Sequence, residues 1–281
     1  MGYECFDVEV VDRVGHIRMN RPEKSNSMVP AFWRELPEIV DGWSQSGSVR
    51  AVVLSADGRH FCSGMDLAVF ADNDSIGPAA ASGHRSRRNE RFRSTALKLQ
   101  DTFTALERAR MPVLCAIQGA CVGGAIDMVS AADMRYADES AFFSIAEINI
   151  GMTADVGTLQ RMPKLVPEGI VRELAYTGRR WSAAEAHAAG FVNAVFSDHE
   201  ALVNGVMEVA AEIATKSPMA VWGTKQSMHY TRDHSVADGL EFIANWNAAM
   251  FDTDDMGEAF TAQIEQRAAE FPDLWPLSEG L

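Results

Sequence analysis

Three acidic residues lie in segments that are otherwise apolar and glycine-rich, and they suggest proton transfer. Asp127 comes shortly after two consecutive glycines, while Glu147 and Asp155 lie on either side of Gly151 in a second apolar segment. A carboxylate in such surroundings must be paired, protonated or used in chemistry, because burying an isolated charge is costly. Carboxylates can act as general acids and bases. Together these residues suggest an enzyme that forms an enolate and moves protons around it.

Two glycine turns precede these carboxylates and could stabilise the enolate oxygen. In the first turn, Gly64 lets the chain bend sharply, so that the backbone N–H of Met65 points outward. In the second, Gly123 and Gly124 open a helix, whose first N–H groups are unpaired and carry its positive dipole end. We therefore predict that Met65 and Gly124 form an oxyanion hole, in which one donor typically contributes about 10²–10³ in rate. The alternative is that the glycine pair only permits tight packing of the helix.

Each carboxylate also has a purely structural interpretation. Asp127 could be an exposed helix carboxylate near a favourable dipole, although its place one turn after Gly124 and its apolar neighbours favour an inward position. Glu147 and Asp155 are expected on the loop that follows a short strand, where a return of the chain could bring both over one ligand. Asp155 could instead be the N-cap of a helix that begins near Thr158, and the local sequence alone favours this cap.

The composition excludes several classes of protein. The chain has 281 residues, is 47% hydrophobic and carries a formal net charge of −14, which argues for a real core and against a nucleic-acid partner. No apolar run approaches the ~20 residues that span a bilayer, and the acidic N-terminus has no apolar signal core. The cysteines and histidines show no metal-ligand spacing, so we predict no metal site. We expect a cytoplasmic protein that binds neither nucleic acid nor membranes.

Short apolar strands alternate with amphipathic helices in the first part of the chain, which predicts an α/β architecture with largely parallel strands. From residue 198 the pattern becomes helical. We therefore divide the chain into an α/β core at 1–197, which carries the site, and a helical C-terminal segment at 198–281. The strands are expected at 6–11, 16–19, 51–54, 113–117, 134–136 and 141–143. The helices are expected at 29–43, 95–109, from 123, and at 200–215, 217–231, 235–250 and 254–269, with a loop at 71–83.

The motifs together resemble the enoyl-CoA hydratase/isomerase (crotonase) superfamily. The resemblance spans essentially the whole chain and rests on Asn20–Lys24, Phe61–Leu67, Ala120–Gly124 and Thr177–Arg179. It implies a spiral of ββα units and a helical C-terminal part that builds homotrimers, often paired into hexamers. It also implies an acyl-CoA substrate, with coenzyme A as part of the substrate and no separate cofactor. The implied substrate contacts are Cys62, Ser63, Gly64, Met65, Asp66 and Gly124, with the thioester oxygen between the N–H groups of Met65 and Gly124.

A narrower resemblance is to the Δ3,5-Δ2,4-dienoyl-CoA isomerases, and it is carried by Asp133–Tyr136, Ala154–Arg161 and Arg232–Val236. These isomerases have Asp, Glu and Asp at the positions of Asp127, Glu147 and Asp155. The resemblance implies conversion of 3,5-dienoyl-CoA to 2,4-dienoyl-CoA in the β-oxidation of unsaturated fatty acids. It further implies that Glu147 serves C2, that Asp155 serves C6, and that Asp127 orients or polarises the pair.

Two other functions remain open from the sequence. A 2-enoyl-CoA hydratase would use Asp127 and Glu147 to hold a water molecule, with Asp155 as a helix cap. A non-catalytic acyl-CoA-binding protein of the same fold is the second alternative, although it would have no need of three carboxylates. Large side chains at Met65, Met152 and Trp246 could shape an acyl pocket, but such residues are more often part of the core.

Overall fold

The computed structural model describes residues 2–66 and 85–277, so the loop expected at 71–83 lies outside the described residues. The fold is built on a six-stranded sheet with the strand order β1-β2-β3-β4-β6-β9. The first pair is antiparallel, and the later neighbours are parallel. The strands are β1 (Phe6–Val11), β2 (Val14–Met19), β3 (Ala51–Ala56), β4 (Val113–Ile117), β6 (Met134–Asp138) and β9 (Ala194–Phe196).

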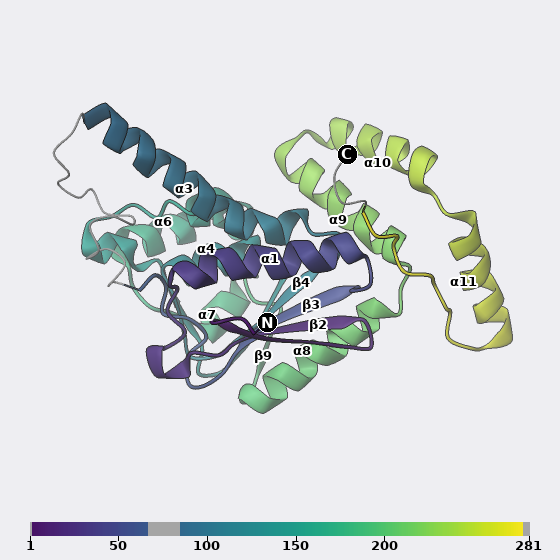
Figure 1. The fold of residues 1–281 in the computed structure, drawn as a ribbon, viewed down its shortest axis with the longest axis horizontal. Coiled ribbons are helices and arrows are strands. Elements are labelled where there is room, and N and C mark those ends of the chain that lie inside the picture. The colour runs from purple at the N-terminus through teal and green to yellow at the C-terminus, as the bar shows by residue number, and fades with distance from the viewer. Residues whose placement is uncertain (1, 67–84, 278–281) are drawn as a thin grey trace.

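The two faces of this sheet are covered by different helices, as Figure 1 shows. Val52, Leu54 and Cys115 point into a core formed with α1 (Pro30–Ser46), α3 (Arg85–Arg108) and α4 (Gly124–Ala131). Val53 and Leu114, which alternate with them along the strands, pack instead against α8 (His199–Ala214). Side chains of successive strand residues point to opposite faces, so the apolar runs read from the sequence are buried on both sides.

A second sheet carries the glycine turns. It consists of β5 (Ala120–Val122), β7 (Phe142–Ser144) and β8 (Trp181–Ser182), in the order β5-β7-β8. An isolated bridge between Cys62 and Cys121 adds the first glycine turn to the edge of β5. The parallel pairing of β5 and β7 brings their carboxyl ends together. The segments that follow these strands therefore meet at one place, and they carry Asp127 and Glu147.

Helix α1 continues through Pro37 without interruption. Proline has no N–H to give to the carbonyl oxygen four residues earlier, here that of Trp33. The hydroxyl of Thr102 on α3 donates to this carbonyl at 3.1 Å. A tertiary contact therefore satisfies the acceptor that the proline leaves open, and the helix continues to Ser46.

The C-terminal helices α9 (Pro218–Asp233), α10 (Val236–Met250) and α11 (Thr253–Glu265) confirm the expected helical segments, and Figure 1 shows them reaching away from the sheet. Six large apolar side chains on α10 and α11 are exposed: Val236, Leu240, Met250, Met256, Phe260 and Ile264. Helix α8, by contrast, packs on the sheet. The division at residue 197 stays a prediction. No helix within 2–66 and 85–277 combines the length and apolar character that crossing a membrane requires.

The remaining short helices connect the strands and frame the site. They are η1 (Pro22–Lys24), η2 (Ala146–Ile150), α5 (Thr158–Arg161), η3 (Met162–Lys164), α6 (Glu168–Thr177) and α7 (Ala183–Ala188). Ser182 caps α7, because it accepts from the N–H of Glu185 and Glu185 reaches back in a capping box. Glu147 lies on η2, and Asp155 lies between η2 and α5.

Candidate active site

Hydrogen bonds with Met28 hold the first glycine turn, and the N–H of Met65 points away from Met28. Met28 donates to the carbonyl of Gly64 at 2.9 Å and accepts from the N–H of Asp66 at 3.0 Å. Because peptide groups alternate in direction along an extended chain, the N–H of Met65, which lies between these two groups, points to the opposite side. The second glycine turn lies on that side.

The two glycine turns lie close enough for their N–H groups to serve one oxygen. A Cβ placed on Gly124 would lie 4.0 Å from the backbone nitrogen of Met65. A Cβ placed on Gly64 would lie 3.4 Å from the nitrogen of Gly124 and 2.7 Å from the carbonyl oxygen of Val122. Gly64 also has a φ of +87°, so both its conformation and its surroundings require glycine. Within the described chain, the N–H groups of Met65 and Gly124 donate to no other group.

A cavity of about 300 Å³ opens beside these two N–H groups. Its walls include the carboxylate residues Asp127, Glu147 and Asp155, and the turn residues Ser63, Gly64, Met65 and Gly124. The apolar part of the wall comes from Trp33, Phe92, Leu99, Ile150, Met152 and Val156. The structure thus brings together most of the residues that the sequence singled out, in surroundings where charge is poorly solvated.

Three of the residues selected from the sequence do not line this cavity. Cys62 is buried beneath the turn, where its thiol donates to the carbonyl of Asn26 at 3.1 Å. Asp66 accepts from the hydroxyl of Ser27 at 3.1 Å and is not part of the cavity wall. Trp246 lines a different cavity, between α9, α10 and α11. Met65 and Met152, the other two large side chains considered for an acyl pocket, do line the site.

Asp127 is the most deeply buried of the three carboxylates, with only 1% of its surface exposed. Its Oδ1 accepts from the backbone N–H of Thr158, the first residue of α5, at 2.6 Å. Burial raises the pKa of Asp127 to about 7, and the neighbouring Glu147 and Asp155 raise it further, while the Thr158 N–H opposes the shift. At neutral pH this carboxyl can therefore exist in either protonation state.

Glu147 is placed by η2, directly after β7. A Cβ on Gly123 would lie 3.3 Å from its Oε1, so the carboxylate lies over the second glycine turn. Its Oε2 is buried and has no hydrogen-bond partner within the described residues. Burial, and next the charge of Asp155, raise the pKa of Glu147. A carboxylate of raised pKa that lines a cavity is well suited to take a proton from a bound molecule.

Asp155 does not cap helix α5, although the local sequence favoured that role. The N-cap residue is Gly157, with a φ of 136°, and no side chain of its own makes a cap hydrogen bond. The carboxylate of Asp127 takes that role instead. Asp155 lines the cavity, and burial raises its pKa. The helix cap that the local sequence favoured for Asp155 is therefore wrong.

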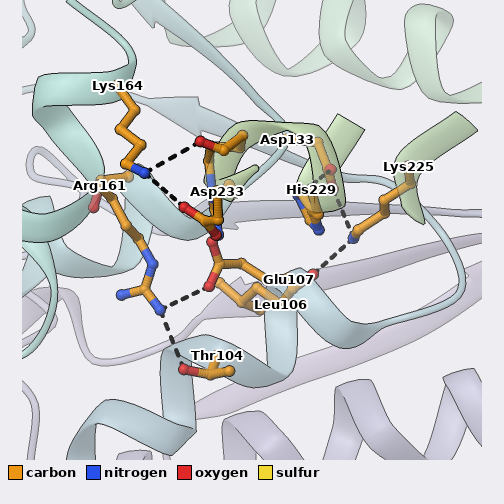
Figure 2. A network of polar contacts seen from close by, with 12 residues as sticks. Thr104, Leu106, Glu107, Asp133, Arg161, Lys164, Lys225, His229 and Asp233 are labelled. Atoms are coloured by element: carbon orange, nitrogen blue, oxygen red, sulfur yellow. Dashed lines mark hydrogen bonds and ion pairs between the residues drawn. The ribbon is translucent and has the colours of Figure 1, made fainter. Parts of the chain in front are cut away.

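A polar network lies behind the site and joins three helices, as Figure 2 shows. Arg161 on α5 donates to Thr104 at 3.1 Å and to Glu107 at 2.8 Å, both on α3. Glu107 also pairs with Arg232 on α9. Nearby, the buried ammonium group of Lys225 donates to Asp133 at 2.8 Å. Neither Glu107 nor Arg161 was expected as a site residue, because their partners lie on other elements.

The arrangement can stabilise an enolate and move protons at two separate carbons. The N–H groups of Met65 and Gly124 can bind an oxygen that becomes negatively charged. Two carboxylates of raised pKa, Glu147 and Asp155, come from different segments and face the same cavity. No group of acidic, histidine and cysteine side chains that could hold a metal ion occurs within the described ranges.

Comparison with known proteins agrees with this geometry. A sequence profile described as enoyl-CoA hydratase/isomerase matches residues 9–274. The chain is 42% identical over 268 residues to the mitochondrial Δ(3,5)-Δ(2,4)-dienoyl-CoA isomerase of Mus musculus, covering 94% of this chain and 81% of that protein. It is also 42% identical over 262 residues to the peroxisomal Δ(3,5)-Δ(2,4)-dienoyl-CoA isomerase of Arabidopsis thaliana, covering 93% of each.

Solved structures resemble this chain over nearly its whole length. A crystal structure of an enoyl-CoA hydratase from Bacillus anthracis matches with a TM-score of 0.85 and 28% identity, over 95% of this chain and 99% of that one. The crotonase-type α/β fold with a helical C-terminal part, expected from the sequence, is therefore confirmed. The names of the two isomerases place them in mitochondria and peroxisomes, so the expected cytoplasmic location stays a prediction.

Proposed function

Because the chain belongs to the enoyl-CoA hydratase/isomerase family, we propose that it converts 3,5-dienoyl-CoA esters to 2,4-dienoyl-CoA esters in fatty acid β-oxidation. The observation that carries the proposal is the presence of Glu147 and Asp155 in one apolar cavity with Asp127, beside two unused N–H groups. Relatives at 42% identity are named as isomerases of this kind.

The reaction begins at the carbon next to the thioester. The proton at C2 is acidic because the resulting carbanion is delocalised into the thioester carbonyl and along the diene. Glu147 takes this proton, and the negative charge that develops on the thioester oxygen is stabilised by the N–H groups of Met65 and Gly124. Removing one donor of such a pair typically lowers the rate about 10²–10³-fold. The raised pKa of Glu147 makes its ionised form a stronger base than an exposed carboxylate.

The second proton transfer occurs at the far end of the diene. The electron pair from the C2–H bond forms the new double bond between C2 and C3, and the C3–C4 pair moves to C4–C5. The C5–C6 pair then takes a proton from Asp155 at C6. Asp155 therefore begins protonated and ends ionised, whereas Glu147 does the reverse. The raised pKa of Asp155 supports its protonated starting state.

Asp127 contributes to the proton balance of the site. Its pKa of about 7 and its electrostatic coupling to both other carboxylates favour sharing of protons among the three groups. After each turnover Glu147 must lose a proton and Asp155 must regain one. A third carboxyl that titrates near neutral pH keeps the site from holding three negative charges at once, which burial would oppose.

The structure favours the isomerase over the hydratase alternative at one residue. A hydratase that used Asp127 and Glu147 on water would leave Asp155 as a cap, but Gly157 is the N-cap of α5. A side chain that lines the cavity without a structural partner suits a second proton transfer. It also argues against a protein that only binds acyl-CoA, because the burial that raises all three pKa values opposes ionisation without benefit to binding.

We also propose that the enzyme is a homotrimer or a hexamer of two trimers, with coenzyme A entering only as part of the substrate. The exposed apolar side chains of α10 and α11 support the assembly, because a subunit interface would remove them from water. The acidic protein need not repel the substrate, since binding depends on local groups.

The experiment is an ultraviolet assay of the purified protein with 3,5-octadienoyl-CoA and, separately, 2-octenoyl-CoA. New absorbance from a 2,4-dienoyl thioester, with little loss of the 2-enoyl signal, is the expected result. Loss of the 2-enoyl signal without dienoyl conversion would instead identify a hydratase. No change in either substrate, with acyl-CoA binding retained in calorimetry, would identify a binding protein.

A further inference from the structure

The segment from Asp155 to Thr158 is held at three successive peptide groups by side chains from elsewhere in the fold. The Nε2 of Gln100 donates to the carbonyl oxygen of Asp155 at 2.7 Å. The Nη1 of Arg161 donates to the carbonyl of Val156 at 3.3 Å. The N–H of Thr158 donates to Asp127 at 2.6 Å. The backbone that carries Asp155 is therefore fixed by side-chain contacts rather than by a regular element.

We propose that Gln100 is a positioning residue, which sets the carboxylate of Asp155 at the C6 end of the substrate without touching the substrate itself. The inference rests on the proposed isomerase function and adds a residue to it. Gln100 lies on α3 next to Leu99, and the two side chains line different cavities. Leu99 lines the cavity, whereas Gln100 lies outside it, behind Asp155.

Asp155 depends on such support because of the backbone around it. Two glycines with positive φ flank it, Gly151 at 74° and Gly157 at 136°, and they leave the chain free to adopt other conformations. No side chain in the described structure donates to its carboxylate, so the carboxylate follows its own backbone. The amide of Gln100 binds the backbone of Asp155 itself. The other two contacts are made with Val156 and Thr158, which follow Asp155 in the chain.

Glu147 is held by different contacts, so a substitution of Gln100 should not move its carboxylate. It lies within η2, where its own carbonyl oxygen accepts from the N–H of Met152 at 3.0 Å and also from that of Gly151. Its carboxylate rests against Gly123. The two proton-transfer groups are thus positioned by separate parts of the fold, so the two steps at C2 and C6 can be disturbed independently.

Arg161 gives a second, stiffer support to the same segment. Its guanidinium group occupies the space beside Gly157 that any side chain there would need. Glu107 holds that guanidinium in turn (Figure 2). Glu107 also pairs with Arg232 on α9. Arg161 has several partners, so its loss would disturb α3 and α5 together. Gln100 is the sharper test because it is neutral and has one hydrogen bond to the segment.

The test compares Gln100→Met, which keeps the length of the side chain and removes its donor, with Gln160→Met. Gln160 lies on α5 and is exposed, and its side chain donates to no group in the described structure, so it controls for the substitution itself. Two rates are measured for each protein in D₂O with 3,5-octadienoyl-CoA. The first is deuterium incorporation at C2 of the remaining substrate, followed by mass spectrometry, and the second is conversion, followed by absorbance.

We expect Gln100→Met to lower conversion about 10–100-fold, since a displacement of about 1 Å at a reacting group can have an effect of that size. Deuterium incorporation at C2 should stay within about twofold of the wild-type rate, so that exchange per turnover rises. Gln160→Met should leave both rates unchanged. A purely structural role for Gln100 would lower both rates in parallel, because the oxyanion hole and Glu147 would be disturbed as well.

Unchanged conversion in Gln100→Met, or a parallel fall of both rates in a folded protein, would overturn the inference. Failure of the proposed function is distinct, because the wild-type protein would then not form the 2,4-dienoyl product. If Gln100→Met does not fold, Gln100→Asn replaces it. The amide is kept but lies about 1.5 Å short of the Asp155 carbonyl, and the same separation of the two rates is expected.

Discussion

The carboxylate of Asp127 accepts the first backbone N–H of helix α5, that of Thr158, at 2.6 Å. The same side chain therefore lines the cavity and caps a helix terminus. A carboxylate at a helix N-terminus is stabilised by the dipole and by the unpaired N–H groups. Here burial outweighs that stabilisation and raises the pKa of Asp127 to about 7. The protein thus keeps a carboxyl group near its titration point at neutral pH.

The raised pKa of Asp127 predicts that stability falls as pH rises from about 4 to 7. The folded protein holds a proton at this site in a range where the unfolded chain, with a pKa near 3.8, has released it. The contribution is complete below the unfolded pKa and is lost as pH passes the folded pKa, with a total of up to about 4 kcal/mol. Glu147 and Asp155 act in the same direction, since burial raises both pKa values.

Urea denaturation at pH 5 and pH 7.5 measures this effect. Asp127→Asn should flatten the pH dependence, because its amide oxygen can still accept from Thr158 but carries no titrating proton. Asp41→Asn, a change at a surface carboxylate paired with Arg108, serves as the control and should leave the slope as it is. An equal slope in the wild type and in Asp127→Asn would show that Asp127 titrates normally.

Deuterium exchange should distinguish the roles proposed for Glu147 and Asp155. Asp155→Asn should lower conversion of the dienoyl substrate by about 10²–10⁴ and leave exchange at C2 largely intact, because Glu147 is untouched. Glu147→Gln should abolish both. The melting temperature of Asp155→Asn should change little, since its carboxylate bonds to no other residue in the described part of the chain. Loss of C2 exchange in Asp155→Asn would reverse the assignment of the two residues.

Gly64→Ala should disable the oxyanion hole. A Cβ at this position would lie 2.7 Å from the Val122 carbonyl, and the backbone has a φ of +87°. The turn must shift and carry the N–H of Met65 with it, so we expect at least a ~10²-fold loss of kcat and a loss of about 1–3 kcal/mol in stability. Activity assays and denaturation of the purified variant measure the two effects.

Gly257→Ala is the matched control for this substitution. Gly257 lies inside helix α11, where a Cβ would meet nothing within 4 Å. Alanine loses less conformational freedom than glycine on entering a helix, so this variant should gain roughly 0.5–1 kcal/mol and keep its activity. A Gly64→Ala protein with normal kcat would show that Met65 does not bind the thioester oxygen.

The parts of the fold that the sequence predicted well are those set by local pattern. The strand β4 occurs at 113–117 as expected, and α9 and α10 begin at Pro218 and Val236, each one residue after the start expected from the sequence. Helix α3 begins ten residues earlier than expected, at Arg85 rather than residue 95. Its first turns are exposed and rich in arginine, so they carry no apolar period that would mark them as helical.

The sequence singled out several of the side chains that line the cavity, but not the contacts that position them. Apolar surroundings marked Asp127 and Glu147, and the structure brings both to the cavity. The local sequence around Asp155 resembles a helix cap, yet the carboxylate that caps α5 comes from 31 residues earlier. The amide that holds the Asp155 carbonyl comes from Gln100, 55 residues away. Contacts between distant segments leave no periodic signal in a single sequence, so such partners were out of reach.

The exposed apolar side chain of Ile264 offers a test of the proposed assembly. This residue on α11 is 82% exposed, so a charge there should not disturb the fold of one subunit. Ile264→Lys should shift the mass measured by light scattering from a trimer or hexamer toward the 30.7 kDa monomer. Gln263→Lys, its exposed polar neighbour, carries the same charge as a control. A wild-type protein that is monomeric would contradict the assembly.

Glu107 should prove important for both stability and activity, because it neutralises two arginines. It is largely buried, and although burial acts to raise its pKa, hydrogen bonds from Arg161 and Arg232 hold the pKa below its usual value. Glu107→Gln would leave both guanidinium groups without their counter-charge, and removing one partner of a buried pair typically costs about 3–5 kcal/mol. Arg232 is partly exposed, so we expect roughly 1–3 kcal/mol here.

The melting temperature should therefore fall by several degrees, given about 2–4 °C per kcal/mol for a chain of this size class. Conversion should fall as well, because Arg161 supports the segment that carries Asp155. Asp101→Asn is the matched control, since this exposed carboxylate on the same helix pairs with Arg108 at the surface, where such pairs contribute little. Equal melting temperatures for Glu107→Gln and Asp101→Asn would show that the Glu107 network does not stabilise the site.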